Sequence, residues 1–237
     1  MPAQPEPVAR YLRRVLPDPP PRIESVILHQ RGELRASTRN GRWSAFTATE
    51  RITISPPSFA WDARVTLPLG LRLRVQDEYL AGAGAGRVSL LALPLASERD
   101  RPELNEGALH RYLAESPWYP TALLPRDGLS WAPIDDRAAR AVLTDHGITV
   151  ALEFRFDQDG DVCGIFSSGR WRKDGAQYRR AAWEGRFSRY ERHAGMRVPV
   201  CGEVGWYESQ RWEAVWRGTI RTAGYHCRAA PVASSRL

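Results

Sequence analysis

Residues 58–67, SFAWDARVTL, alternate cleanly between an apolar side and a mainly polar side. The apolar side carries Phe59, Trp61, Ala63, Val65 and Leu67, and the other side carries Asp62, Arg64 and Thr66. A period of two with one apolar side is typical of a strand that has one buried and one wet face. This stretch therefore predicts an antiparallel sheet whose apolar face packs on the protein's own core.

The same alternation extends outward from this strand. It recurs at residues 50–54, 71–76 and 148–156, and turn signals separate the runs at Asn40-Gly41, Pro56-Pro57, Asp159-Gly160, Asp174-Gly175 and Ala194-Gly195. Short connections of this kind suit hairpins and a meander more than helical crossovers. We predict a mainly β (α+β) chain: a curved antiparallel sheet or unclosed β-barrel of about ten to twelve strands with two short helices.

Two segments depart from the strand pattern. Residues 5–16 carry an apolar stripe at helical spacing that prolines then end, which predicts an N-terminal helix. Residues 96–125 form a long insertion, in which Asp100 is the expected helix cap with Glu103 three residues later. Because this insertion ends in a proline-rich run, we expect a lid or a plug for the concave side of the sheet. Residues 1–237 are expected to form one domain, with residues 229–237 frayed.

Composition bounds the class of protein and its surroundings. The 237 residues are 43% hydrophobic and 26% charged, with nine tryptophans and a net charge of +7. The basic residues are spread along the chain rather than clustered, so we expect no nucleic-acid partner but leave open a peripheral contact with anionic lipid. No run has the length of a membrane span. An odd number of cysteines, three, and a start without a signal-peptide core predict a cytoplasmic protein.

The sequence contains no motif typical of a metal, calcium or dinucleotide site. Histidines and cysteines are scattered, which predicts no metal site, and Asp157, Asp159 and Asp161 lack the spacing of a calcium loop and suit a tight turn. The glycines at 82, 84 and 86 lead into a strand, whereas a dinucleotide loop leads into a helix. We expect no cofactor. Asp135-Asp136 suits a turn better than a pair of catalytic acids.

Several stretches together resemble an uncharacterised bacterial family found largely in actinobacteria. The most specific are WYPTALLP (118–125), WEGRF (183–187) and VPVCGEVGW (198–206). The strand pattern is also similar to that of lipoprotein carriers of the LolA/LolB type. That resemblance implies a half-barrel whose concave face holds acyl chains, although fold alone does not determine function. Since this chain starts without a signal or a lipidation cysteine, it does not imply lipoprotein sorting.

Our leading hypothesis is a binding protein that holds a hydrophobic or amphipathic small molecule, lipid-like or natural-product-like, on the concave face. The candidate ligand-binding residues are Tyr112, Trp118, Tyr119, Thr121, Trp61, Arg64, Trp183 and Trp206. A second hypothesis is a cofactor-independent enzyme of the cyclase, isomerase or hydrolase type in the same cavity. Its proton-transfer groups would be Glu115, Arg111, Tyr119 and Asp136. A third hypothesis is a structural or partner-binding module with a plugged sheet. Ligand identity and oligomeric state stay open.

Overall fold

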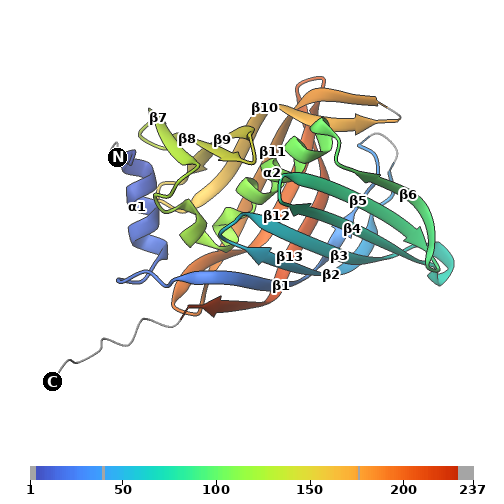
Figure 1. The fold of residues 1–237 in the computed structure, drawn as a ribbon, viewed down its shortest axis with the longest axis horizontal. Helices are drawn as coiled ribbons and strands as arrows, with labels where there is room; N and C mark the ends of the chain where they lie inside the picture. Colours follow the sequence, from blue (N-terminus) through green and yellow to red (C-terminus); the bar gives the residue numbers. More distant parts are fainter. Residues whose placement is uncertain (1–3, 39–40, 176, 229–237) are drawn as a thin grey trace.

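The computed structural model describes residues 4–38, 41–175 and 177–228, and places thirteen strands in one antiparallel sheet (Figure 1). The strands are β1 (Ile23–Leu34), β2 (Ser44–Thr53), β3 (Ser58–Thr66), β4 (Arg72–Leu80), β5 (Ala83–Leu90), β6 (Leu93–Arg99), β7 (Leu129–Asp135), β8 (Ala138–Asp145), β9 (Ile148–Phe156), β10 (Val162–Asp174), β11 (Gln177–His193), β12 (Met196–Glu208) and β13 (Arg211–Cys227). The helices are α1 (Glu6–Val15) and α2 (Pro102–Ala114), and the 3-10 turns are η1 (Pro68–Gly70), η2 (Ser116–Trp118) and η3 (Pro120–Leu123).

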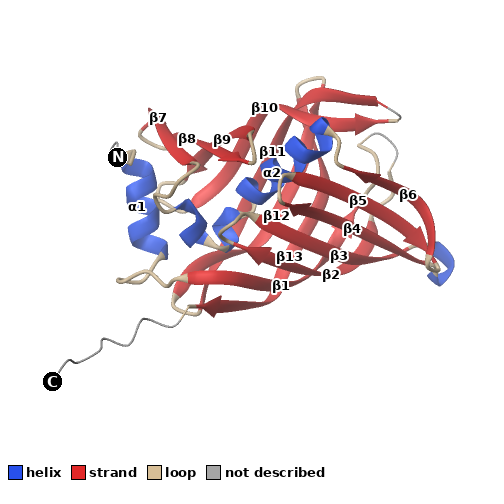
Figure 2. Cartoon of the chain, in the orientation of Figure 1, coloured by secondary structure: helices blue, strands red, loops and turns tan. Residues whose placement is uncertain are grey.

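The sheet consists of two meanders that meet along one seam. Strands β1 to β6 form an N-terminal wing and β7 to β13 a C-terminal wing, and β1 pairs with β13 between them. The sheet is unclosed because β6 and β7 stand at its two edges. Helix α2 runs between the wings and contacts β4 and β5 on one side and β9 and β10 on the other (Figure 2). The expected curved antiparallel sheet with two helices is confirmed.

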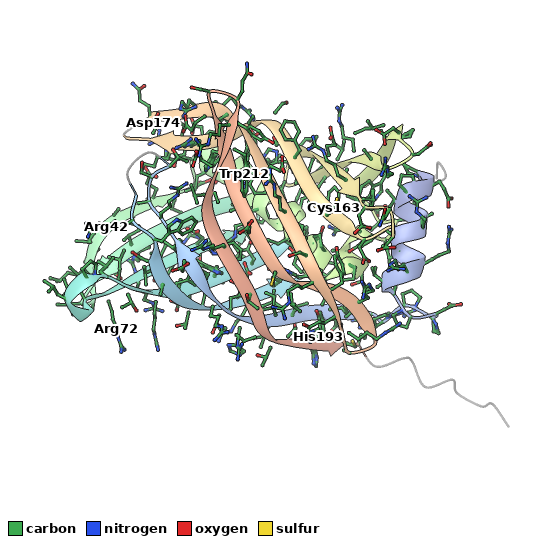
Figure 3. All side chains as sticks on the ribbon, turned by 180° about the vertical axis from the view of Figure 1, so that it is seen from behind. Arg42, Arg72, Cys163, Asp174, His193 and Trp212 are labelled. Atoms are coloured by element: carbon green, nitrogen blue, oxygen red, sulfur yellow. The ribbon has the colours of Figure 1, made fainter. Side chains whose placement is uncertain are left out.

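Alternation along the strands places one face of the sheet on the core. In β3 the side chains of Phe59, Trp61, Ala63 and Val65 are buried, and in β9 those of Val150, Leu152, Phe154 and Phe156 are buried. We call this the inner face, since α2 and the 3-10 turns after it pack against it. The opposite, outer face carries the arginine-rich polar side chains (Figure 3).

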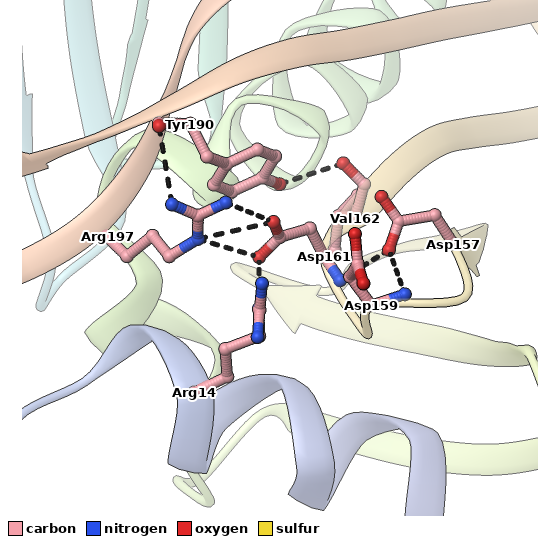
Figure 4. Close-up of polar contacts among 7 residues, drawn as sticks. All are labelled: Arg14, Asp157, Asp159, Asp161, Val162, Tyr190 and Arg197. Carbon is pink, nitrogen blue, oxygen red and sulfur yellow. Dashed lines mark hydrogen bonds and ion pairs between the residues drawn. The ribbon is translucent and has the colours of Figure 1, made fainter.

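Helix α1 closes one end of the C-terminal wing through an ion-pair cluster (Figure 4). The buried Asp161 carboxylate accepts from Arg14 at 3.1 Å and from Arg197 at 2.7 Å. Asp157 Oδ1 accepts from the backbone N–H groups of residues 159 and 161, which forms the tight turn between β9 and β10. The acidic run therefore forms the tight turn that its spacing indicated, and Asp161 in addition binds two arginines.

The cap predicted for α2 is wrong. The helix begins at Pro102 with Arg101 as the N-cap, because proline suits the first helical position with its fixed φ. Asp100 lies one residue earlier at φ 52 and its Oδ1 accepts from Asn105 Nδ2 at 2.9 Å. The first residues of the expected insertion also belong to β6, which brings the strand number above our estimate. The frayed tail and Asn40 lie outside the described residues.

Candidate functional site

The proline-rich segment after α2 fills the middle of the inner face. We call η2, Tyr119 and η3 the plug. Tyr119 donates a hydrogen bond to the Tyr112 carbonyl at 2.5 Å, Tyr112 donates to the Ile54 carbonyl at 3.0 Å, and Tyr225 of β13 donates to the Trp118 carbonyl at 2.8 Å. These bonds satisfy buried backbone carbonyls in α2, in the connection after β2 and in the plug itself. The plug is therefore tied to α2 and to both wings, and its residues 116–123 are buried.

Trp118 is the largest side chain of the plug. Its ring lies 5.8 Å from that of Phe187 and 6.3 Å from that of Trp216, measured between centroids. Gly202 on β12 leaves the space for it, since a Cβ at this position would come within 3.2 Å of the indole. The Trp118 Nε1 atom is buried without a hydrogen-bond partner among the described residues.

A charged cluster lies beside the plug, toward the turns that join β1 to β2 and β3 to β4. Arg111, on α2, donates to Glu50 of β2 at 3.0 Å, to Asp77 of β4 at 3.0 Å and to Glu115 at 2.8 Å. The arginine thus joins the helix to two strands of the N-terminal wing. One Glu115 oxygen, Oε2, is buried and has no partner in the described structure.

Aromatic rings flank this arginine, and an amide holds its partner Glu50. The guanidinium lies 4.9 Å from the centroids of both Phe59 and Trp61, a geometry that favours a cation. Gln30 bridges the cluster, accepting from Trp61 Nε1 at 2.8 Å and donating to Glu50 Oε2 at 2.8 Å. Every polar atom of Glu50 and Gln30 named here is therefore hydrogen-bonded, as buried groups require.

The C-terminal wing contributes a second arginine. Arg170 of β10 stacks over the Trp183 ring at 4.6 Å and donates to the Gly107 carbonyl at 3.1 Å. No carboxylate pairs with it in the described part of the chain. Nearby, Arg172 stacks over Trp206 at 5.3 Å and pairs with Glu208. Each wing thus has a tryptophan on the inner face that faces an arginine, Trp61 with Arg111 of α2 and Trp183 with Arg170.

Burial shifts the pKa values of these groups. Desolvation raises the pKa of Glu50 well above its usual range, and the neighbouring Glu115 carboxylate adds to the shift. The side chain of Asp77 keeps 42% of its surface exposed, yet desolvation also raises its pKa. Burial, together with the Arg111 charge, lowers the pKa of Arg170 to about 10. Although burial opposes the charge of Arg111, the carboxylates of Glu115, Glu50 and Asp77 raise its pKa. The arginine stays charged, and the deepest carboxyl favours its proton.

Comparison with known proteins places the chain in a family. A family model described as "Family of unknown function (DUF6544)" matches residues 1–218. The chain belongs to this family. No curated protein matches this DUF6544 chain. Among solved structures it is similar to a LolA-superfamily protein of Nitrosomonas europaea, with 10% identity, a TM-score of 0.35, and coverage of 95% of this chain and 93% of that one. A likeness of this size carries no information about function, and the largely actinobacterial origin expected for the family stays a prediction.

The DUF6544 chain contains no helix long and apolar enough to cross a membrane within its described residues. Its three cysteines are present as free thiols.

The structure brings together part of the predicted site. Arg111 and Glu115 join in the cluster, and Trp61 lies against it. Tyr112, Tyr119, Trp118 and Thr121 belong to α2 and the plug, where they are buried. Trp183 and Trp206 lie on the inner face under Arg170 and Arg172. Two predicted residues lie elsewhere: Arg64 is on the outer face, and Asp136 is in the exposed turn between β7 and β8.

Three members of the cluster were not predicted from the sequence. Glu50 and Ile52 are two residues apart in a strand and therefore lie on the same buried face. Asp77 lies on the same face as Val75 and Tyr79 for the same reason. A carboxylate on the apolar side of a strand is a signal that strand periodicity makes visible. Arg170 gave no such signal, because the register shift between Ser167 and Arg170 breaks the alternation of β10.

Proposed function

We propose that this protein binds an amphipathic small molecule, lipid-like or natural-product-like, on the inner face between α2 and the open end of the sheet. By the open end we mean the side where the β1–β2, β3–β4, β10–β11 and β12–β13 connections lie. The observation that carries the proposal is the Arg111 cluster, because three ion pairs fix a charged group on an inner face that is largely apolar and aromatic.

The inner face beyond the cluster supports an apolar ligand moiety. Side chains there remain partly exposed although they point to the inside of the sheet, namely Leu34, Leu73, Val75, Trp206 and Trp216. The plug already occupies the neighbouring area, so the ligand's apolar part would lie toward the open end. We expect a ligand of one narrow chain or ring system rather than several acyl chains.

Arg170 supports an acidic or hydrogen-bond-accepting headgroup. A guanidinium carries five N–H donors, and the described residues offer Arg170 one acceptor, the Gly107 carbonyl. Burial and the neighbouring Arg111 charge lower the pKa of Arg170, and a bound anion would offset both by stabilising the charged guanidinium. The headgroup would therefore lie between Arg170 and the partly exposed Asp77–Arg111 pair, and it would contact the two arginines.

Calorimetric titration with a long-chain fatty acid tests this proposal. We expect saturable binding at one site, weakened about tenfold, or ~1.4 kcal/mol, by Arg170→Gln. The matched control is Arg140→Gln, because Arg140 is an exposed arginine of β8 without an ion pair in the described structure. Unsaturable heat, or equal affinity for the Arg170→Gln variant and the wild type, would count against the site.

A second function is favoured by the carboxyl pair at Arg111. A buried carboxyl with a raised pKa beside a second carboxylate is an arrangement that acid–base enzymes use. As a cofactor-independent enzyme, the protein would use Glu50 and Glu115 for proton transfer and Arg111 for charge stabilisation. Turnover of a bound ligand lost in Glu115→Gln, with binding retained, would favour this alternative. The hydroxyl groups of Tyr112 and Tyr119 are engaged with backbone carbonyls, which makes them weaker candidates.

A third function follows from the plug, which supports a structural or partner-binding role if no ligand enters. We also keep the proposal of a single-domain protein in the cytoplasm, supported by three free thiols in a chain of this size. Recovery of the three cysteines as free thiols from intact cells would be the expected result.

A further inference from the structure

The N-terminal wing ends in two neighbouring turns that form a tip (Figure 1). The tip comprises residues 64–74, from β3 through η1 into β4, and residues 87–97, from β5 into β6. Because Val65 pairs with Leu73 and Leu73 with Leu90, both turns project from the same end of the wing.

The tip exposes large apolar side chains. Five leucines are exposed there: Leu69 at 99%, Leu91 at 73%, Leu93 at 69%, Leu95 at 61% and Leu71 at 41%. They are five of the eight exposed large hydrophobic side chains among the described residues. Such a concentration on two turns is unlike the scattered single exposures of an ordinary surface.

The backbone of the tip disfavours the leucines that it carries. Leu69 has φ 63 and Leu91 has φ 49, so both occupy the left-handed region. Glycine or asparagine is more stable in that conformation than leucine. Leucine is therefore present at two positions where the left-handed backbone conformation disfavours it. This indicates that the apolar side chains themselves have a function.

Arginines surround the leucines. Arg64, Arg72, Arg74 and Arg87 line a hollow of about 390 Å³ on the outer face, with Leu91 and Pro94 at its rim. Arg74 pairs with Asp62, with one contact at 2.9 Å, whereas Arg64, Arg72 and Arg87 make no hydrogen bond or ion pair with any described residue. Residues 64–74 and 87–97 contain these four arginines and no aspartate or glutamate.

We propose that the tip docks onto an anionic membrane surface. The leucines would enter the boundary between headgroups and acyl chains, and the arginines would contact the phosphate and carboxylate groups of the lipids. A lipid surface suits the tip better than a protein groove does, because the leucines project from protruding turns beside four arginines, three of which have no ion-pair partner among the described residues. This contact is peripheral and spans nothing.

Docking would also orient the inner face. The tip lies at the same end of the sheet as the β1–β2 and β12–β13 connections, so the open end would turn toward the lipid. An amphipathic ligand would then pass between membrane and inner face without crossing bulk water. This consequence rests on the proposed function, whereas docking itself does not.

Co-sedimentation with phosphatidylcholine vesicles, with and without about one third phosphatidylserine, tests the docking. We expect the wild type to pellet with the anionic vesicles only, and less so at high salt. The double variant Leu69→Asn/Leu91→Asn should lower partitioning by at least about tenfold. Asparagine tolerates the left-handed backbone, so the fold should persist.

Two controls separate docking from other effects. Leu80→Asn removes an exposed leucine at the far end of β4 and should leave partitioning unchanged. Fatty-acid affinity measured by calorimetry should be unchanged in the double variant, which keeps failure of the docking distinct from failure of the ligand site. Equal pelleting of the double variant and the wild type would overturn the proposal. So would a dimer in sedimentation velocity that the double variant abolishes, because the tip would then bind a second copy of the chain.

Discussion

At the residue scale, Glu50 shows how a charge is accommodated inside an apolar face. Its carboxyl is completely buried, with Arg111 on one oxygen and Gln30 on the other. One arginine faces three carboxyls, so the cluster has more acidic groups than its central cation balances. Retaining a proton on the deepest carboxyl reduces that excess, which agrees with the raised pKa of Glu50.

The pH dependence of stability tests this protonation. Folding raises the pKa of Glu50 above the ordinary value of 4.5, so the folded state holds the proton more tightly than the unfolded chain. The stability from this group is complete below that value and is lost as pH rises toward the folded-state pKa. Glu50→Gln removes the titration. We therefore expect the free energy of unfolding of Glu50→Gln, relative to wild type, to increase between about pH 5 and about pH 8 in urea denaturation.

Glu203→Gln serves as the control, since Glu203 is exposed on β12 and makes no ion pair with the described residues. Its effect on unfolding should be the same at both pH values. A relative stability of Glu50→Gln that stays constant or falls with pH would show that Glu50 is ionised in the folded protein.

At the scale of elements, the plug covers apolar side chains of the inner face that the opposite wall would cover in a closed barrel. It covers the inner face of the unclosed sheet. Its Trp118 carbonyl accepts from Tyr225 of β13, and its Tyr119 hydroxyl donates to the Tyr112 carbonyl of α2. Trp118 is the plug side chain whose removal should cost the most stability, because it packs among Phe187, Trp216 and Gly202 of β12.

Replacing that side chain should leave a cavity under the plug. We expect Trp118→Ala to lower the free energy of unfolding by about 3–5 kcal/mol, measured by guanidinium denaturation. Trp171→Ala is the matched control: Trp171 is half-buried on β10, with its Nε1 bonded to Glu106, and its loss should cost about 1–2 kcal/mol. Equal losses for the two variants would mean that the plug contributes no more than a surface hairpin.

The elements also show what the sequence could and could not predict. Strands β3 and β9 were predictable because each keeps a strict period of two, and the insertion was predictable from its prolines. The cap of α2 was not, because Pro102 competes with Asp100 for the start of the helix. The cluster was found only in part, since Arg111 and Glu115 are neighbours on one helix whereas Glu50, Asp77 and Arg170 come from three distant strands.

At the scale of the whole molecule, the two wings, α2 and the plug divide the inner face into a filled part and a part toward the open end. The Arg111 cluster lies at the boundary between them, and the leucine tip extends from the same end. This arrangement puts a candidate headgroup site and an aromatic wall on the inner face, with a candidate membrane contact at the open end of the same sheet. An amphipathic ligand is the molecule that would use all three.

Native mass spectrometry of the protein purified from its own host, followed by denaturing extraction, tests this ligand most directly. We predict a stoichiometric small-molecule adduct with an apolar portion and an acidic headgroup, released on denaturation and absent from Arg170→Gln prepared in parallel. A bare protein mass under gentle conditions, from the wild type in its own host, would contradict ligand binding and favour a plugged sheet that contacts other proteins.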